Sequence, residues 1–244
     1  MSSIRRTRIY RILAAGWGIL SALAVALAII LLAPFGLSRR AFFRLSAAWV
    51  RQQLALCGVA WSVEGWEALP QAIRDGQQPV VFMPNHASLL DPPFVLTALP
   101  LHPVFIAKKE IRLIPLVGWA VACAGMIYID RGSRERAVAS LKQAAQQVRA
   151  GKSVVIFPEG TRTRDGGLLS FKKGGFHLAA DAGVPIVPVG IQGAFEVLPK
   201  GTYLLNPGRI RVAVGTPIPA TEHPDREALM AAVRSQIEAL LGEG

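Results

Sequence analysis

The chain has 244 residues, with 27 Lys and Arg against 16 Asp and Glu, a formal net charge of +11, and 52% hydrophobic residues. This length fits one domain of catalytic size with an appendage, and the apolar content excludes a wholly disordered chain. Composition also excludes collagen-like, coiled-coil and disulfide-framework proteins. The two cysteines, Cys57 and Cys123, form no CxxC pair and cannot hold a structural zinc ion by themselves.

The positive charge is concentrated near the N-terminus. Residues 1–63 contain eight arginines and no acidic residue, whereas residues 64–244 hold 19 basic and 16 acidic residues. A nucleic-acid binder more often spreads its cations over a folded face, so we expect no nucleic-acid partner. The arginines instead flank an uncharged apolar run from Ile12 to Leu37.

This apolar run favours burial in lipid. As a helix it reaches roughly 39 Å, and a bilayer core needs about 30 Å. A signal peptide is less favoured because its apolar core usually has about 7–15 residues, and a buried helix of a soluble domain is rarely apolar on all sides for so long. Four arginines on each side give no charge asymmetry to orient a single span. Equal flanks suit a helix that enters and returns on one side, turning at Pro34-Phe35-Gly36.

The segment from Ser38 to Cys57 predicts an amphipathic helix. Its apolar residues recur near helical spacing, and its polar positions include Arg40, Arg44 and Arg51. Such a helix can lie at the headgroup level of a membrane or pack on the domain that follows, and both interpretations stay open. We therefore expect residues 1–58 to form a two-helix membrane anchor and residues 59–244 to form a separate domain.

From Val59 onward short apolar runs alternate with longer helical patterns. The predicted strands are Trp61–Glu64, Val80–Met83, Val104–Ala107, Met126–Ile129, Val154–Phe157, Ile186–Val189 and Ile210–Val214. The predicted helices are Asp91–Ala98, Arg134–Ala150, Gly174–Ala182 and Asp225–Leu241. This alternation predicts an α/β fold with a mixed, largely parallel sheet flanked by helices.

In such a fold function is expected in the loops beyond the strand ends, and the first such loop contains His86 and Asp91. A neutral imidazole held by a carboxylate is a general base. On a continuous helix two residues five apart would point roughly 140° apart, so the chain must turn between them. Asn85 and Ser88 favour that turn, and Pro92 restrains Asp91. Either Asp91 caps the following helix, or Ser88 caps it and Asp91 completes a capping box.

The second loop, Glu159-Gly160-Thr161-Arg162, has the composition of an anion site. Gly allows close backbone approach, Thr donates a hydroxyl hydrogen bond, and Arg grips phosphate through two donors. Further cations near sheet ends are Lys108, Arg131 and Lys172. The chain contains no G-x-S-x-G, H-E-x-x-H or Walker A pattern, which excludes the enzyme classes that those motifs mark.

With both loops considered, the chain resembles the PlsC-like glycerolipid acyltransferases, the 1-acyl-sn-glycerol-3-phosphate acyltransferases. The first loop matches the N-H-x4-D box of that family, and Phe157–Arg162 matches its F-P-E-G-T-R box. Between them, Phe105–Glu110 is similar to the second block of the family, and Val184–Val189 is similar to the fourth. The resemblance covers roughly residues 60–220 and identifies residues 59–244 as an acyltransferase domain.

The resemblance implies a role for each matching residue. His86 is the catalytic base for the glycerol hydroxyl of lysophosphatidate, Asp91 orients it, and Asn85 supports it. The phosphate is bound by Lys108, Glu159, Gly160, Thr161 and Arg162, with support from Arg131 and Lys172. The strand Val184–Val189 is expected to shape an apolar wall near an acyl chain.

The resemblance also implies transfer from acyl-CoA or acyl-ACP to give phosphatidate, with no metal and no cofactor beyond that co-substrate. The expected partners are a membrane lipid acceptor and acyl-CoA or acyl carrier protein, and the expected location is the cytoplasmic face of the inner membrane. Two alternatives are an acyltransferase for another lyso-lipid, such as a lyso-ornithine lipid, and a membrane lipid-binding scaffold. The scaffold is disfavoured because it needs neither loop.

Overall fold

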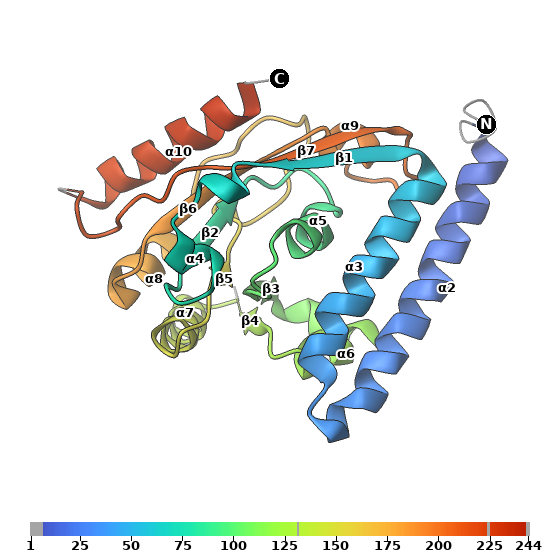
Figure 1. Ribbon diagram of the computed structural model, residues 1–244, viewed down its shortest axis with the longest axis horizontal. Coiled ribbons are helices and arrows are strands. Elements are labelled where there is room, and N and C mark those ends of the chain that lie inside the picture. The colour runs from blue at the N-terminus through green and yellow to red at the C-terminus, as the bar shows by residue number, and fades with distance from the viewer. Residues whose placement is uncertain (1–6, 131, 224, 243–244) are drawn as a thin grey trace.

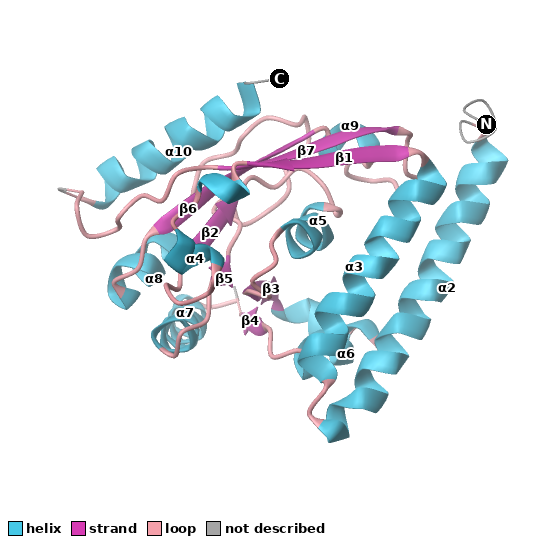
Figure 2. Ribbon diagram, viewed as in Figure 1, coloured by secondary structure: helices cyan, strands magenta, loops and turns pink. Residues whose placement is uncertain are grey.

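The computed structural model describes residues 7–130, 132–223 and 225–242. Two long helices, α2 (Arg8–Leu32) and α3 (Ser38–Cys57), stand beside a seven-stranded sheet with helices on its faces (Figure 1). Figure 2 shows helices on both sides of the strands and several long loops between these elements. The chain thus divides into an N-terminal helical pair and an α/β layer structure.

The helical pair is a hairpin. Thr7 caps α2 by accepting a hydrogen bond from the backbone N–H of Tyr10. A 3-10 turn (Ala33–Phe35) follows α2, and Gly36, at φ +69°, reverses the chain into α3. The helices pack along each other, and Trp49 Nε1 donates to the carbonyl of Gly18 at 3.2 Å. The turn predicted at Pro34-Phe35-Gly36 is confirmed.

One side of α2 is apolar and exposed. Its inner side buries Ala14, Gly18, Ala26 and Ile29 against neighbouring helices. Its outer side exposes large apolar residues, namely Ile9, Ile12, Leu13, Trp17, Ile19, Leu20, Leu27 and Leu31. Arg8–Phe35 is the one segment of the described chain with a helix long and apolar enough to cross a membrane, and 11% of its most apolar window is buried. The helix is therefore not a buried core helix.

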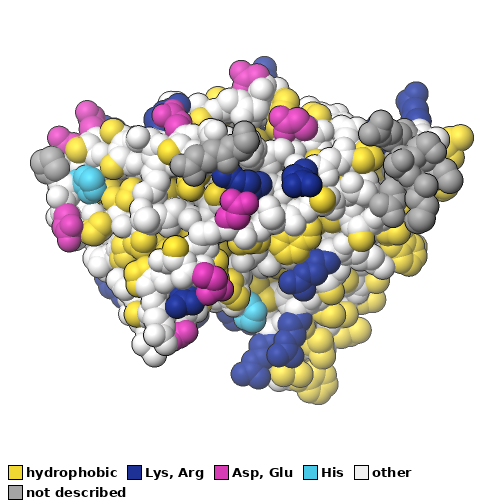
Figure 3. Space-filling model, turned by 45° about the horizontal axis from the view of Figure 1, so that its top comes forward, with side chains coloured by type: hydrophobic (Ala, Val, Ile, Leu, Met, Phe, Trp, Pro, Cys, Tyr) yellow, Lys and Arg dark blue, Asp and Glu magenta, His cyan; other side chains and the backbone are white. Residues whose placement is uncertain are grey.

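The amphipathic helix α3 matches its predicted bounds and packs on the domain that follows. Phe43, Val50 and Leu54 are buried, whereas Arg40, Arg44 and Arg51 are exposed. Figure 3 shows dark blue Lys and Arg side chains beside the yellow apolar surface at the right, where the N-terminal helices lie. Its packing leaves its arginines available to the headgroup level as well.

The sheet confirms the predicted fold class. Its strands are β1 (Val59–Glu64), β2 (Val81–Pro84), β3 (Val104–Lys108), β4 (Ile127–Ile129), β5 (Val154–Val155), β6 (Ile186–Gln192) and β7 (Gly208–Val214). They lie in the order β1-β7-β6-β2-β5-β3-β4. All neighbours are parallel except β6 and β7. The carboxyl ends of β2 and β5 therefore meet at the same edge.

Helices cover both faces of the sheet. On one face α3 and α5 (Asp91–Ala98) bury Phe82, Phe94 and Ile210. On the other face the core includes Met83 and Phe176 under α7 (Arg134–Arg149), α8 (Gly174–Ala182) and α10 (Arg226–Gly242). Phe82 and Met83 point to opposite faces because side chains alternate along a strand.

The sequence patterns predicted the seven strands within a few residues and α5 and α8 at their observed bounds. They did not predict the short helices α4 (Gln71–Arg74), α6 (Val117–Cys123) and α9 (Ala194–Val197) or the 3-10 helices, which include η2 (Trp66–Ala68) and η3 (Lys109–Leu113). Among these, α6 and η3 matter for the site because they lie between β3 and α2.

Candidate active site

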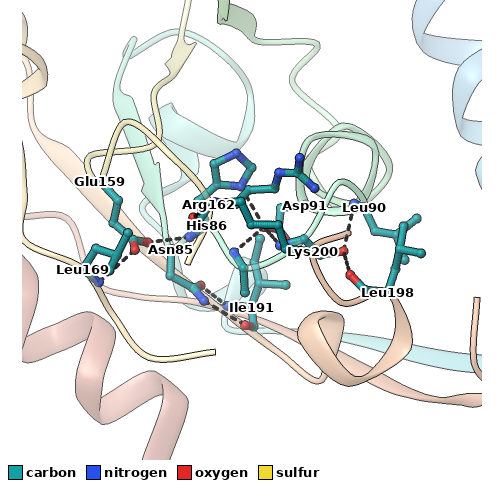
Figure 4. A network of polar contacts seen from close by, with 12 residues as sticks. Asn85, His86, Leu90, Asp91, Glu159, Arg162, Leu169, Ile191, Leu198 and Lys200 are labelled. Carbon is teal, nitrogen blue, oxygen red and sulfur yellow. Dashed lines mark hydrogen bonds and ion pairs between the residues drawn. The ribbon is translucent and has the colours of Figure 1, made fainter. Parts of the chain in front are cut away.

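The loop after β2 brings His86 and Asp91 into contact. His86 Nδ1 lies 2.8 Å from Asp91 Oδ2, and α5 begins at Asp91 (Figure 4). The imidazole is 17% exposed and the carboxylate is fully buried. The contact predicted from the turn residues is confirmed.

The carboxylate of Asp91 organises this turn in a way that differs from both predicted capping arrangements. The N-cap of α5 is Leu90, which makes no side-chain cap. Asp91 Oδ2 instead accepts hydrogen bonds from the backbone N–H groups of Ala87 and Ser88, both at 2.7 Å. Ser88 Oγ accepts from the N–H of Leu90 and donates to the carbonyl of Leu198. A short loop with Pro92 and Pro93 in the first helical turn thus folds back on its own carboxylate.

Two backbone N–H groups and the imidazole of His86 thus converge on one oxygen of Asp91, which fixes the position of the carboxylate. The start of a helix adds a partial positive charge at the same point. The ring of His86 stacks on Phe157, with centroids 4.2 Å apart and an interplanar angle of 27°. In the tautomer in which Nδ1 donates to Asp91, Nε2 is the ring nitrogen that can accept a proton.

Asn85 fixes the start of the loop to the neighbouring strand. Its side-chain oxygen accepts from the N–H of Ile191 at 2.6 Å, and its side-chain nitrogen donates to the carbonyl of Ile191 at 3.0 Å. Asn85 is buried, so these bonds replace the strand pairing that ends at this point. Its support of His86 comes from this position in the backbone.

Glu159 lies behind the catalytic loop. Its Oε1 accepts from the N–H of His86 at 2.6 Å, and its Oε2 accepts from the N–H of Leu169 at 2.9 Å. Burial raises the pKa of Glu159 to about 7 against the lowering effect of those two hydrogen bonds. The residue is 2% exposed and is absent from the described lining of the cavity in front of His86. Its position therefore differs from the expected contact with phosphate.

A cavity of about 870 Å³ opens in front of His86. Its walls include the predicted residues Lys108, Gly160, Thr161, Arg162 and Lys172. Two consecutive lysines, Lys108 and Lys109, match the second block of the family. Lys108 lines the cavity, whereas Lys109 forms an ion pair with Asp130 at 2.9 Å and is outside the described lining. Arg131, the remaining predicted cation, lies outside the described residues.

Lys200 also lies near the site, although no sequence motif predicts it. Its Nζ donates to the carbonyl of Arg162 at 3.0 Å, and Figure 4 shows both residues close to His86 and Asp91. The loop after α9 that carries Lys200 also accepts the hydrogen bond from Ser88. No spacing in the sequence connects residues so far apart.

A second, apolar cavity of about 280 Å³ adjoins the first. Pro92, Phe105, Ala107 and Ile111 line both. Its other walls come from α2, α3, α5 and α6, together with Met126. The strand β6 is absent from the described lining of either cavity, which differs from the apolar wall expected at Val184–Val189.

Over the described residues, no group of three or more His, Cys, Asp or Glu side chains is placed to hold a metal ion. The site consists instead of one imidazole–carboxylate pair and several cations around a cavity. This arrangement has the groups needed to move a proton and to attract an anion in one cavity.

Comparisons with known proteins relate the chain to one family. A family model described as "Acyltransferase" matches residues 61–192. A chloroplastic 1-acyl-sn-glycerol-3-phosphate acyltransferase of Brassica napus is 40% identical over 157 residues, which cover 64% of this chain and 44% of the relative. A 1-acyl-sn-glycerol-3-phosphate acyltransferase of Chlamydomonas reinhardtii is 32% identical over 228 residues, covering 91% of this chain and 67% of the relative. The chain thus spans less than half the length of the Brassica napus relative.

Among solved structures, the crystal structure of the 1-acyl-sn-glycerophosphate acyltransferase PlsC from Thermotoga maritima superimposes with a TM-score of 0.80. The two sequences are 25% identical, and the match covers 97% of each chain, including the N-terminal helices. The family match, the relatives and the shared fold agree with the resemblance in the two loops. The chain belongs to the PlsC-like 1-acyl-sn-glycerol-3-phosphate acyltransferase family.

Proposed function

We propose that this protein transfers an acyl group from an acyl thioester to the free hydroxyl of lysophosphatidate, giving phosphatidate. The observation that carries the proposal is the contact between His86 and the buried Asp91 at the wall of a cavity lined by cations. The relatives support the proposal, since each is named as a 1-acyl-sn-glycerol-3-phosphate acyltransferase.

In the proposed reaction His86 is the general base. Its Nε2 takes the proton of the acceptor hydroxyl while Nδ1–H stays hydrogen-bonded to Asp91, whose charge stabilises the imidazolium. The oxygen attacks the thioester carbonyl, a C–O bond forms and the C–S bond breaks. His86 then returns the proton to the departing thiolate. The donor is acyl-CoA or acyl-ACP, and no further cofactor takes part.

The acceptor phosphate is placed against the cationic wall. Arg162 and Lys108 supply charge, Thr161 supplies a hydroxyl, and Lys172 lies on the same wall. Gly160, at φ +71°, adopts a left-handed conformation that suits glycine and shapes the loop after β5. In this proposal Glu159 acts on His86 through the backbone instead of on the phosphate.

We place an acyl chain in the apolar cavity, which shares its walls with the catalytic one. We also propose that residues 1–58 anchor residues 59–244 to the cytoplasmic face of the inner membrane. The exposed apolar side of α2 would lie in lipid, and Arg40, Arg44 and Arg51 on α3 would face anionic headgroups. A lipid acceptor would then reach the site from the membrane.

The test is an acceptor panel with the full chain in vesicles and labelled acyl-CoA or acyl-ACP. We expect acylation of lysophosphatidate, and we expect Arg162→Ala to lower kcat/KM for it by about 10- to 100-fold through loss of a charged hydrogen bond. The matched control is Arg164→Ala, because Arg164 is exposed and outside the described cavity lining. Absence of lysophosphatidate acylation would reject the proposed function. Equal rates with acceptors that lack a phosphate, or an Arg162→Ala variant as active as the control, would reject recognition of the phosphate by this site.

A further inference from the structure

A short segment beside the catalytic cavity exposes large apolar side chains. We name residues 111–119, which run from the second half of η3 into the first turn of α6, the lip. Within it Leu113 is 79% exposed, Trp119 54% and Ile114 47%. The other side of α6 is packed, since Leu116, Val117 and Ala120 contact Ala26 and Ile29 of α2. The lip therefore has one face against α2 and one face outward.

The backbone that holds these residues outward has a strained conformation. Leu116 has φ +60° and ψ −57°, and the N–H of Val117 donates to the carbonyl of Pro115, which makes a γ-turn of the rare, strained kind. A Cβ on Gly118 would lie 2.4 Å from the carbonyl oxygen of Ile111, so only glycine allows this close turn. Tyr128 Oη also donates to the carbonyl of Gly118 at 2.8 Å. A constrained turn that exposes Leu113 and Ile114 suits a surface that contacts a partner.

The position of the lip indicates what covers it. Through α6 it packs against α2, the helix whose other side is apolar and exposed, and Figure 1 shows α6 beside α2 and α3. At its other end Ile111 lines both cavities, and Lys108, just before it, lines the catalytic one. Arg112 and Lys108 are exposed beside the apolar residues. Apolar side chains, an indole and cations in one strip suit the boundary between acyl chains and anionic headgroups.

We infer that the lip inserts into the same membrane leaflet as α2 and forms the edge over which a lysolipid passes into the catalytic cavity. The contact with the leaflet is independent of the reaction, whereas the passage of a lysolipid rests on the proposed function. Along this route the acyl chain of the lipid stays against Leu113 and Ile114 while its phosphate meets Arg112 and Lys108.

The first experiment measures insertion. Cys123→Ser removes the exposed thiol, and the buried Cys57 stays. In that background Leu113→Cys, Leu20→Cys and Val138→Cys are each labelled with an environment-sensitive fluorophore and mixed with vesicles of phosphatidylglycerol and phosphatidylethanolamine. Val138 is the matched control because it is 44% exposed on α7, away from α2 (Figure 1). We expect a blue shift at positions 113 and 20 and none at 138.

A blue shift at 20 without one at 113 overturns the inference. No shift at either position rejects both the inference and the membrane anchor. A shift at 138 equal to that at 113 shows nonspecific adsorption and also overturns the inference.

The second experiment measures passage of the acceptor. We expect the double variant Leu113→Ser/Ile114→Ser to lower kcat/KM by at least about tenfold for lysophosphatidate embedded in vesicles, because two apolar side chains that the inference places in the leaflet are lost. For a short-chain lysophosphatidate that is dispersed in water, we expect a change of less than about twofold, since His86 and its partners are untouched. Equal losses with both acceptors, or no loss with either, contradict the route. A wild-type chain that acylates neither acceptor rejects the proposed function and the route, while the fluorescence result still decides the contact with the leaflet.

Discussion

Replacing Asp91 with Asn tests the electrostatic role of its carboxylate with little change of shape. Oδ2 accepts all three hydrogen bonds, from His86, Ala87 and Ser88. The amide oxygen of Asn can take that position, and its NH₂ then replaces Oδ1, which has no hydrogen-bond partner in the described structure. His86 keeps its donor contact, but the negative charge beside the imidazolium is lost.

The magnitude follows from that charge. Two unit charges about 4 Å apart interact by roughly 4 kcal/mol at an effective dielectric constant of about 20. If this stabilisation is present mainly in the transition state, kcat falls about 10³-fold. We expect KM for lysophosphatidate to stay within a few-fold, because the cations of the cavity are unchanged.

The assay is steady-state release of thiol from the acyl donor, with circular dichroism to verify the fold. Asp75→Asn is the matched control, because it makes the same chemical change at an exposed position. We also expect the double variant His86→Ala/Asp91→Asn to be no slower than His86→Ala alone, because the two residues act as a unit. An Asp91→Asn enzyme that keeps more than a tenth of wild-type kcat would refute the reasoning.

Three further predictions concern stability and the apolar cavity. Because burial raises the pKa of Glu159 to about 7, the stability that its protonated carboxyl confers is present below about pH 4.5 and is lost as the pH rises through about 7. Thermal unfolding of Glu159→Gln should therefore depend less on pH across this window, and parallel curves for the two proteins would contradict this. Asn85→Ala should lower stability by about 1–3 kcal/mol for each Ile191 group left unpaired, and an unchanged melting temperature would contradict that. Ala120→Leu should fill part of the apolar cavity and shift preference toward shorter acyl chains in a mixture of donors, whereas a uniform loss for all chain lengths would place the chain elsewhere.

The contact between His86 and Asp91 was predictable because a turn is local. A few backbone angles are restricted by Asn85, Ser88 and Pro92. The carboxylate five residues after the imidazole can then adopt only a few positions. The hydrogen bonds that hold Asp91 were not predictable, because two backbone N–H groups compete with a helix cap for the same oxygen and only the loop geometry decides.

Elements with a clear period were predicted, and those without one were not. The helix α8 has the expected bounds. The bounds of α5 were predicted from a local signal instead, because Pro92 and Pro93 in its first turn mark where the helix begins. The helix α6 is seven residues long and apolar throughout, so no polar side reveals its period. The insertion of β7 between β1 and β6 depends on pairing between distant segments, about which local patterns carry no information.

The site was predicted where side chains meet the cavity and missed where they act through the backbone. Glu159 sits in a motif, but its buried contacts with the N–H groups of His86 and Leu169 depend on tertiary structure. Lys200 reaches Arg162 from a loop without any motif. The apolar cavity is formed where α2, α3 and α6 meet, so no single segment of sequence indicates it.

The central claim is that His86 removes the proton of the acceptor hydroxyl directly. The measurement is the initial rate of acyl transfer from a labelled acyl thioester to lysophosphatidate by folded His86→Ala enzyme relative to wild type. The account predicts a loss of about 10²–10⁴-fold, the usual contribution of a general base. A His86→Ala enzyme within tenfold of the wild-type rate would contradict it.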